Sequence, residues 1–229
     1  MPKVRAFEEA PKETYYLLIV DSSTSMRHLT NSTISGVNEQ IDSIKELEKE
    51  YPDQKYHMDF IHFNTSVTTE YTNRPSTSLE HINESNYRCT GMTALLDAIG
   101  TGVRNLNDKI GEKIKSGEAT AVVVIITDGE ENASREFGSD KVKSMISELT
   151  ATGKWTFTFV GANIDAISTA TKYGINTNNV MAFSSDAMSN SNVYKSMSSS
   201  FKKRASKLND NSYSSDDFLS EEDKDVTTK

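Results

Sequence analysis

The sequence has almost no cysteine and no long hydrophobic run, and these absences exclude several kinds of protein. The single cysteine, Cys89, cannot form a disulfide within the chain, which fits a reducing compartment. No segment approaches the roughly 18 consecutive apolar residues of a membrane span, and residues 1–9 lack the apolar run of a signal peptide. We therefore expect a cytoplasmic protein that does not insert into a membrane.

Positive charge is also in deficit. The chain has 25 Lys and Arg against 33 Asp and Glu, a net charge of -8, so a phosphate backbone is a poor partner and we expect no nucleic-acid binding. The phosphate-binding loop Gly-x-x-x-x-Gly-Lys-Ser/Thr and the nucleophile elbow Gly-x-Ser-x-Gly are both missing. The four histidines do not cluster in the sequence, which argues against a zinc site.

Apolar residues recur with the periods of strands and helices in turn. The pattern predicts strands at 15–20, 55–63, 67–71, 119–126, 154–161 and 179–183. It predicts helices at 34–51, 93–115, 139–150, 164–173 and 187–208, with one short helix near 79–82 in an otherwise polar loop. This alternation indicates right-handed crossovers on a mostly parallel sheet. The strand at 67–71 follows its predecessor through a tight turn, so it is expected to be antiparallel and at an edge.

The alternating pattern is continuous, and this predicts a single domain. A chain of 229 residues with 35% hydrophobic content can bury one substantial core. We predict an N-terminal extension at 1–13, a domain at 14–208, and a disordered tail at 209–229. The tail is assigned because this segment is rich in acidic residues and poor in apolar ones.

Three oxygen-bearing side chains follow the first predicted strand at two-residue intervals: Asp21, Ser23 and Ser25. In parallel sheets, ligands bind beyond the carboxyl ends of the strands. Oxygen donors suit a small hard cation, but three do not complete the octahedron that Mg²⁺ demands. Taken alone, the same residues would also form an ordinary turn that caps a helix.

Two more residues complete the candidate site. Asp128 follows the apolar strand at 119–126, and a doubly wound sheet would bring it beside Asp21. Thr93 precedes the second long helix, where its hydroxyl would cap free backbone N–H groups or turn to a metal ion. We therefore predict a cation site made of Asp21, Ser23, Ser25, Thr93 and Asp128.

These motifs resemble the metal-ion-dependent adhesion site of von Willebrand factor type A domains. The resemblance rests on Asp-x-Ser-x-Ser at 21–25, Gly-x-Thr at 91–93 and Thr-Asp-Gly at 127–129, and it covers roughly residues 15–183. It implies a three-layer, doubly wound, Rossmann-like α/β fold with a mostly parallel six-stranded sheet, one antiparallel edge strand and helices on both faces. It also implies an intact metal site in a standalone domain of bacterial or phage type.

The resemblance further implies a metal-dependent protein interaction module. Mg²⁺ or Mn²⁺ would be bound by the hydroxyls of Ser23 and Ser25, and by Asp21, Thr93 and Asp128 directly or through water. A Glu or Asp of a protein partner would complete the coordination. Two carboxylates among neutral donors leave a cation electrophilic, which favours an acidic ligand. Glu130 and Glu131 follow the site directly, and either would weaken this preference if it faced the metal.

Two alternatives come from other functional classes. The metal could serve only to hold loops together in a structural or assembly protein. The chain could also be a Mg²⁺-dependent phosphohydrolase that uses Asp21 as nucleophile, although the general acid expected two residues later is replaced by Ser23. Asp97, on the second long helix, is expected to be a solvated or capping acid. We predict that the protein is not an enzyme.

Overall fold

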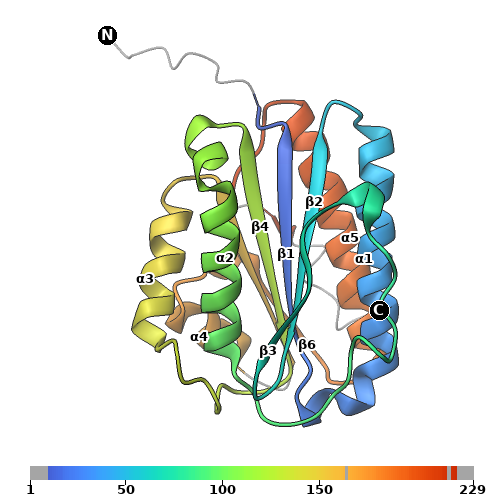
Figure 1. Cartoon of the computed structure of the whole chain (residues 1–229), viewed down its shortest axis with the longest axis vertical. Coiled ribbons are helices and arrows are strands. Elements are labelled where there is room, and N and C mark those ends of the chain that lie inside the picture. The colour runs from blue at the N-terminus through green and yellow to red at the C-terminus, as the bar shows by residue number, and fades with distance from the viewer. Residues whose placement is uncertain (1–9, 163–164, 216–217, 221–229) are drawn as a thin grey trace.

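The computed structural model describes residues 10–162, 165–215 and 218–220. In this part of the chain, the strands form one sheet in the order β3-β2-β1-β4-β5-β6 (Figure 1). All neighbouring strands are parallel except β2 and β3, so β3 is an antiparallel edge strand as predicted. The strands are β1 (Glu13–Asp21), β2 (Lys55–Phe63), β3 (Val67–Pro75), β4 (Ala119–Thr127), β5 (Trp155–Ala162) and β6 (Val180–Phe183).

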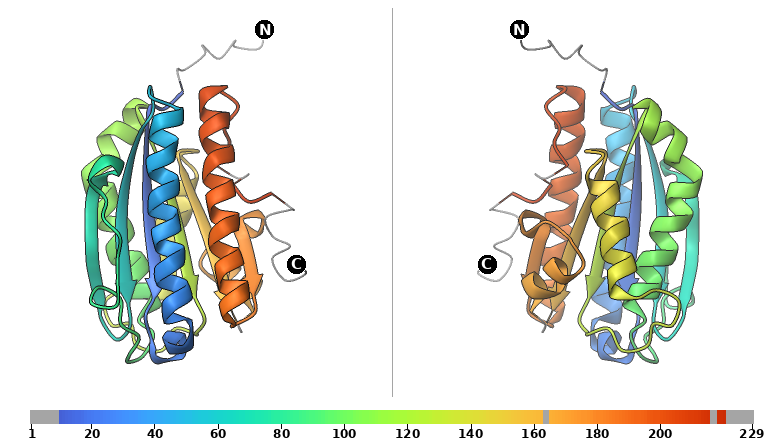
Figure 2. Two further views of the ribbon diagram at one scale, coloured as in Figure 1. Left: turned by 90° about the vertical axis from the view of Figure 1, so that its right-hand side faces the viewer. Right: turned by 90° about the vertical axis from the view of Figure 1, so that its left-hand side faces the viewer.

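Helices cover both faces of this sheet, which confirms the predicted fold class. The bundle of α2 (Leu95–Ser116), α3 (Ser139–Thr150) and α4 (Ala166–Lys172) packs on one face, and the pair α1 (Thr30–Glu50) and α5 (Ala187–Asn209) packs on the other (Figure 2). Short 3-10 turns occur at η1 (Thr24–Leu29), η2 (Ser76–Ser78) and η3 (Thr177–Asn179). None of the helices in the described residues is long and apolar enough to span a membrane.

The two faces of the sheet have separate hydrophobic cores because side chains alternate along each strand. In β1, Tyr16, Leu18 and Val20 face α1 and α5, whereas Leu17 and Ile19 face α2. The central strand β4 is buried along its whole length, as its run of β-branched residues predicts. The parallel strands all end at the lower edge of the sheet in Figure 1, where the predicted ligands lie.

Most predicted element bounds differ from the structure by one to four residues, and three differences concern more than the fraying of an end. The segment 79–82 is not helical; β3 instead continues to Pro75 and is followed by the turn η2. Thr93 is not the N-cap of α2, because that helix begins at Leu95 and its N-cap residue is Ala94, which has no capping side chain. The helix predicted from 164 begins at Ala166, and residues 163–164 lie outside the described residues.

Part of the predicted disordered tail packs against the domain. Phe218 and Leu219 are only 3% and 4% exposed and belong to the core between the sheet and α5. Asn179 holds this segment at two points, because its side chain donates to the Ser215 carbonyl (3.2 Å) and accepts from the Phe218 amide (3.3 Å). The prediction of disorder was wrong here because it rested on the average composition of the segment, which is acidic and polar and hides two apolar residues. Residues 221–229 of the predicted tail lie outside the described residues.

Replacing Phe218 with alanine should lower the free energy of unfolding by about 3 kcal/mol, because it removes a buried ring that packs on Phe201. Urea denaturation of the full chain would measure this loss. Phe218→Leu is the matched control and should lose less than about 1.5 kcal/mol, since it keeps an apolar side chain in the same place. An alanine variant as stable as the native chain would show that the segment does not contribute to the core.

Candidate metal centre

Asp21 is the last residue of β1 and its side chain is fully buried at the edge of the sheet. Both of its carboxylate oxygens accept hydrogen bonds. The Thr127 hydroxyl donates to one of them (2.6 Å) and the Ser23 amide donates to the other (2.7 Å). Thr127 ends β4, which pairs with β1, so the parallel register brings these two residues together. The carboxylate is therefore held in one orientation.

The hydroxyls of the first loop connect Asp21 to Asp128. Ser23 Oγ and Ser25 Oγ lie 2.9 Å apart, and Ser25 Oγ donates to Asp128 Oδ1 at 2.6 Å. Ser23 and Asp128 are buried, whereas Ser25 is exposed at the rim. The structure therefore brings four of the five predicted residues into one group of oxygen atoms.

Thr93 joins this group from the loop before α2. A methyl group placed on Gly129 would lie 3.3 Å from Thr93 Oγ1, 3.7 Å from Ser25 Oγ and 3.9 Å from Asp21 Oδ2. Oxygens from two separate loops thus lie near one point beside Gly129 in a third loop, and the absence of a side chain at Gly129 leaves room for them to converge. Carboxylate and hydroxyl oxygens are the donors that Mg²⁺ and Mn²⁺ accept. The residues present fit a small divalent cation.

Thr93 is fixed by the loop that follows β4, not by capping its own helix. The Thr93 amide donates to Asn132 Oδ1 (2.9 Å), and the Thr93 carbonyl accepts from the Asn132 and Ala133 amides (3.0 and 3.2 Å). Both polar groups of the Thr93 backbone are therefore engaged, and its hydroxyl remains free to face Gly129. Asn132 was not predicted as a functional residue.

Glu131 caps α2 in place of Thr93. Its carboxylate accepts from the Leu96 amide (2.9 Å) and from the amides of Ala133 and Ser134 (2.9 and 2.7 Å). A negative charge at this position is favoured by the helix dipole. The Glu131 carboxylate is therefore bonded at the helix terminus and does not face the candidate metal position. Glu130 is exposed.

Asp97 is a capping acid for the same loop, as predicted in general terms. Its carboxylate accepts from three consecutive amides, those of Arg135, Glu136 and Phe137, at 2.8 to 2.9 Å. Together with Glu131, it ties the loop after β4 to the first turn of α2. The position of Thr93 relative to Asp128 therefore depends on this docked loop.

The two acidic residues of the site have raised pKa values. Burial raises the pKa of Asp21 to about 6, the Asp128 charge adds to this, and the hydrogen bonds from Thr127 and Ser23 oppose it. Burial also raises the pKa of Asp128, against the hydrogen bond from Ser25. Two partly desolvated carboxyl groups that repel one another are stabilised by a nearby cation. The electrostatics of the site therefore favour a bound metal ion.

Aromatic and imidazole side chains support the loop from behind. The buried Tyr87 hydroxyl donates to the Asp21 carbonyl, and its ring meets the edge of His62. His62 Nδ1 lies 3.1 Å from Ser22 Oγ, and burial lowers the pKa of this histidine. Ser22, between two predicted ligands, is therefore turned inward and away from the oxygen group.

No group of three or more His, Cys, Asp or Glu that could hold a metal occurs among the described residues. A metal at this edge would therefore depend on hydroxyl oxygens as well as carboxylates.

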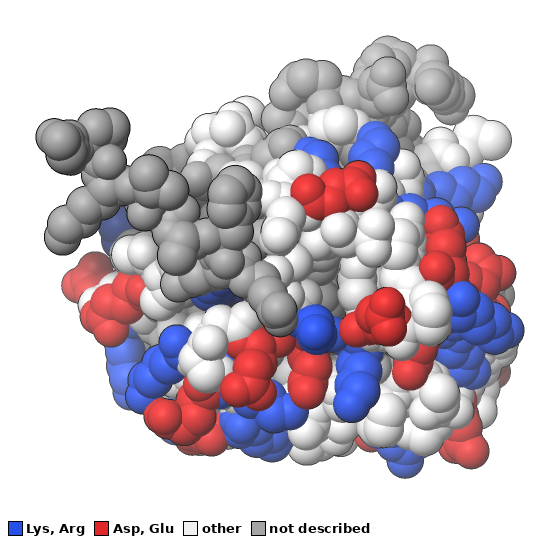
Figure 3. Space-filling model, turned by 90° about the horizontal axis from the view of Figure 1, so that it is seen from above, with Lys and Arg blue, Asp and Glu red and all other residues white. Residues whose placement is uncertain are grey.

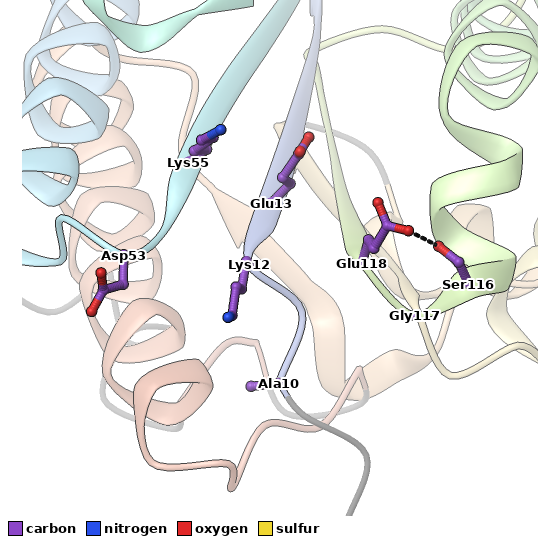
Figure 4. A pocket seen from close by; sticks show the side chains of 8 residues that line it. All are labelled: Ala10, Lys12, Glu13, Asp53, Lys55, Ser116, Gly117 and Glu118. Carbon is purple, nitrogen blue, oxygen red and sulfur yellow. Dashed lines mark hydrogen bonds between the residues drawn. The ribbon is translucent and has the colours of Figure 1, made fainter.

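The opposite end of the sheet contains a cavity of about 510 Å³ lined by Lys12, Glu13, Lys55 and Glu118 among others (Figure 4). Lys12 points away from the direction taken by Lys55 and Glu13 (Figure 4), and Glu118 accepts a hydrogen bond from Ser116. Charges of both signs are interspersed over that end (Figure 3).

A family model described as von Willebrand factor type A domain matches residues 17–204. The chain belongs to this family. The match includes all five predicted ligands and every strand of the sheet except the first residues of β1. A search among curated protein sequences finds no match to this chain.

Several solved structures share the fold of this von Willebrand factor type A domain. A von Willebrand factor type A protein from Catenulispora acidiphila has 13% identity and a TM-score of 0.54 over 82% of this chain and 42% of that chain. Proximal thread matrix protein 1 from the mussel byssus has 13% identity and a TM-score of 0.53 over 82% and 46%. The chain spans less than half the length of both.

The manganese-loaded TRAP protein of Plasmodium vivax is a third similar structure. It has 16% identity and a TM-score of 0.50 over 76% of this chain and 70% of that chain. At such identities the likeness concerns the fold alone. The predicted three-layer α/β fold of the von Willebrand factor type A family is therefore confirmed, and the function of its oxygen-rich edge has to be argued from the residues.

The pH dependence of stability tests the burial of Asp21. Because folding raises its pKa from 3.8 to about 6, the folded state binds this proton more tightly, and stability should fall as pH rises between these values. Relative to Asp21→Asn, the native chain should lose about 3 kcal/mol between pH 4 and pH 7. Urea unfolding of both proteins in a chelator would measure the difference, and a constant difference across pH would contradict it.

Proposed function

We propose that this domain is a metal-dependent protein interaction module. In this proposal Asp21, Ser23, Ser25, Thr93 and Asp128 form an intact metal-ion-dependent adhesion site for Mg²⁺ or Mn²⁺. When bound, such a cation supplies a coordination position for a carboxylate oxygen of a protein partner. The observation that carries the proposal is the convergence of Thr93 Oγ1, Ser25 Oγ and Asp21 Oδ2 around Gly129. The manganese-loaded TRAP structure, which shares the fold, agrees with this choice of metal.

The balance of donors supports recognition of an acidic partner. The group contains two carboxylates, and its other donors are neutral hydroxyls. Two carboxylates only balance the charge of a divalent cation and neutral hydroxyls donate weakly, so the cation stays electrophilic and can accept an additional carboxylate. Glu131 does not add a third negative charge to the oxygen group, because its carboxylate is engaged by α2 and its own loop.

We also propose that the site is not catalytic. A phosphohydrolase would need Asp21 as an accessible nucleophile, but this side chain is fully buried and both its oxygens accept hydrogen bonds. The position two residues later is Ser23, which is a poor general acid at neutral pH. We propose in addition that the domain acts in the cytoplasm, with which the single Cys89 is consistent.

A purely structural metal is the second candidate. It is favoured by the number of contacts that tie these loops together, such as those of Thr24 with Gly91 and of Asn132 with Thr93. The two functions differ in one measurable respect. A structural metal would raise the melting temperature without making the domain bind acidic peptides, whereas an interaction site would do both.

Metal titration tests the ligand set. Asp128→Asn should weaken Mn²⁺ binding by at least about tenfold, because it removes one of only two carboxylates from the oxygen group. Calorimetry with Mn²⁺ alone would measure this affinity. The matched control is Glu130→Gln, which removes one charge from an exposed neighbouring position and should leave the affinity within about twofold. Equal losses in the two variants would indicate general charge attraction in place of a defined site.

A second substitution tests whether the docked loop positions the Thr93 hydroxyl. Asn132→Ala removes the acceptor for the Thr93 amide and leaves all five predicted ligand residues unsubstituted. It should weaken Mn²⁺ binding by about tenfold while the far-ultraviolet circular dichroism stays unchanged. Asn132→Asp keeps the acceptor oxygen and should restore most of the affinity. If both variants bind Mn²⁺ like the native chain, Thr93 either is not a ligand or does not depend on this loop.

A further inference from the structure

The exposed large hydrophobic side chains of the described residues all lie at the edge of the sheet that carries the candidate site. They are Met92 (51% exposed), Ile167 (59%) and Met188 (71%). Met92 immediately precedes Thr93, and the other two lie in the first turns of α4 and α5, which follow the carboxyl ends of β5 and β6. Elsewhere in the described part of the chain, large apolar side chains are buried or partly buried.

Met92 is exposed on a loop that is held on both sides. Gly91 has φ +75°, a backbone conformation that favours glycine, and its carbonyl accepts from the Thr24 hydroxyl at 2.9 Å. The Met92 amide donates to Thr65 Oγ1 at 3.0 Å. The backbone of Met92 is therefore fixed beside the first metal-binding loop, and the exposure of its side chain is not the result of a loose segment.

Ile167 and Met188 are presented by two copies of the same helix start. The sequences Asp165-Ala-Ile-Ser168 and Asp186-Ala-Met-Ser189 each use the aspartate as N-cap, accepting from the serine amide at 3.0 and 2.9 Å. In both, the small alanine after the cap is followed by an exposed apolar residue. The two caps therefore place a large apolar side chain at the same position of two helix starts, which follow the neighbouring strands β5 and β6.

Contacts also connect Met188 to the candidate site. Both ring nitrogens of His28 lie within hydrogen-bond distance of carbonyl oxygens, Nδ1 at 2.8 Å from that of Ser25 and Nε2 at 3.0 Å from that of Ser185. Ser185 directly precedes the cap that presents Met188. The loop that contains Ser23 and Ser25 is thus in contact with the segment that carries Met92, through Thr24 and Gly91, and with the segment that precedes Met188, through His28 and Ser185.

We propose that Met92, Ile167 and Met188 form an apolar rim that binds an acidic and hydrophobic segment of a protein partner. This inference rests on the proposed metal-dependent function and specifies the partner of that site. The partner segment provides one Asp or Glu for the metal and apolar side chains on one or both sides of it. Methionine is flexible and polarizable and adapts to varied apolar surfaces, so the rim fits several related sequences more readily than one rigid shape. Exposed apolar area at a charged centre contributes affinity when a partner covers it.

Peptide selection tests the kind of partner. Random peptides displayed on phage are captured by the immobilised full chain in Mn²⁺ and eluted with a chelator. The eluted peptides should be enriched in Asp or Glu with Leu, Ile, Phe or Met nearby. A selected peptide should bind about tenfold or more weakly to the triple variant Met92→Ser, Ile167→Ser, Met188→Ser. The matched control with Leu at the three positions should bind like the native chain, and Mn²⁺ affinity should be equal in all three proteins.

The possible failures separate the two proposals. If no peptide is released by the chelator, the interaction function itself is contradicted, and this inference fails with it. If chelator-released peptides are acidic but have no enrichment of apolar residues, or if the serine variant binds them as tightly as the native chain, the apolar rim is overturned while the metal-dependent function stands. Apolar peptides that stay bound in chelator would also overturn the rim as a partner of the metal site.

Discussion

Burial of the Asp21 carboxylate at the end of β1 is the constraint on which this edge of the molecule depends. A charged group without access to water is costly unless its oxygens are hydrogen-bonded or paired with a cation. Thr127 and the Ser23 amide meet part of this requirement, and they do so only if β4 lies beside β1 and if the chain turns sharply after Asp21. The same two conditions bring the hydroxyls of Ser23 and Ser25 to Asp128.

The loops around this carboxylate are joined mainly by side chains that bond to backbone groups of distant segments. Glu131 accepts from the Leu96 amide, which the helix start leaves without an internal partner, and Asn132 accepts from the Thr93 amide just before the helix. Asp97, on α2, accepts in turn from the Arg135 amide in the loop after β4. Anchoring on backbone amides fixes the path of the chain while leaving the hydroxyl of Thr93 uncommitted. The geometry around Gly129 is thus prepared by residues that do not belong to the oxygen group.

The fold could be predicted almost completely from the sequence, and the candidate site only in part. Long runs such as 119–126 have the composition of a buried parallel strand, and Asp21 and Asp128 could be placed at one edge because both follow such strands. Asn132 and Glu131 carried no local signal, since their partners lie 35 to 39 residues away. Local patterns also misplaced Thr93 as a cap, and average composition hid the buried pair Phe218 and Leu219.

The order of the strands has a consequence for how the chain matures during synthesis. β1 lies between β2 and β4, so the first-made strand acquires its second neighbour only after more than a hundred further residues have been added. Until Thr127 emerges, the Asp21 carboxylate lacks its hydroxyl donor and the oxygen group lacks Asp128. A nascent chain therefore carries four of the five residues of the candidate site long before Asp128 joins them, and the oxygen group is completed in one late step, when β4 docks.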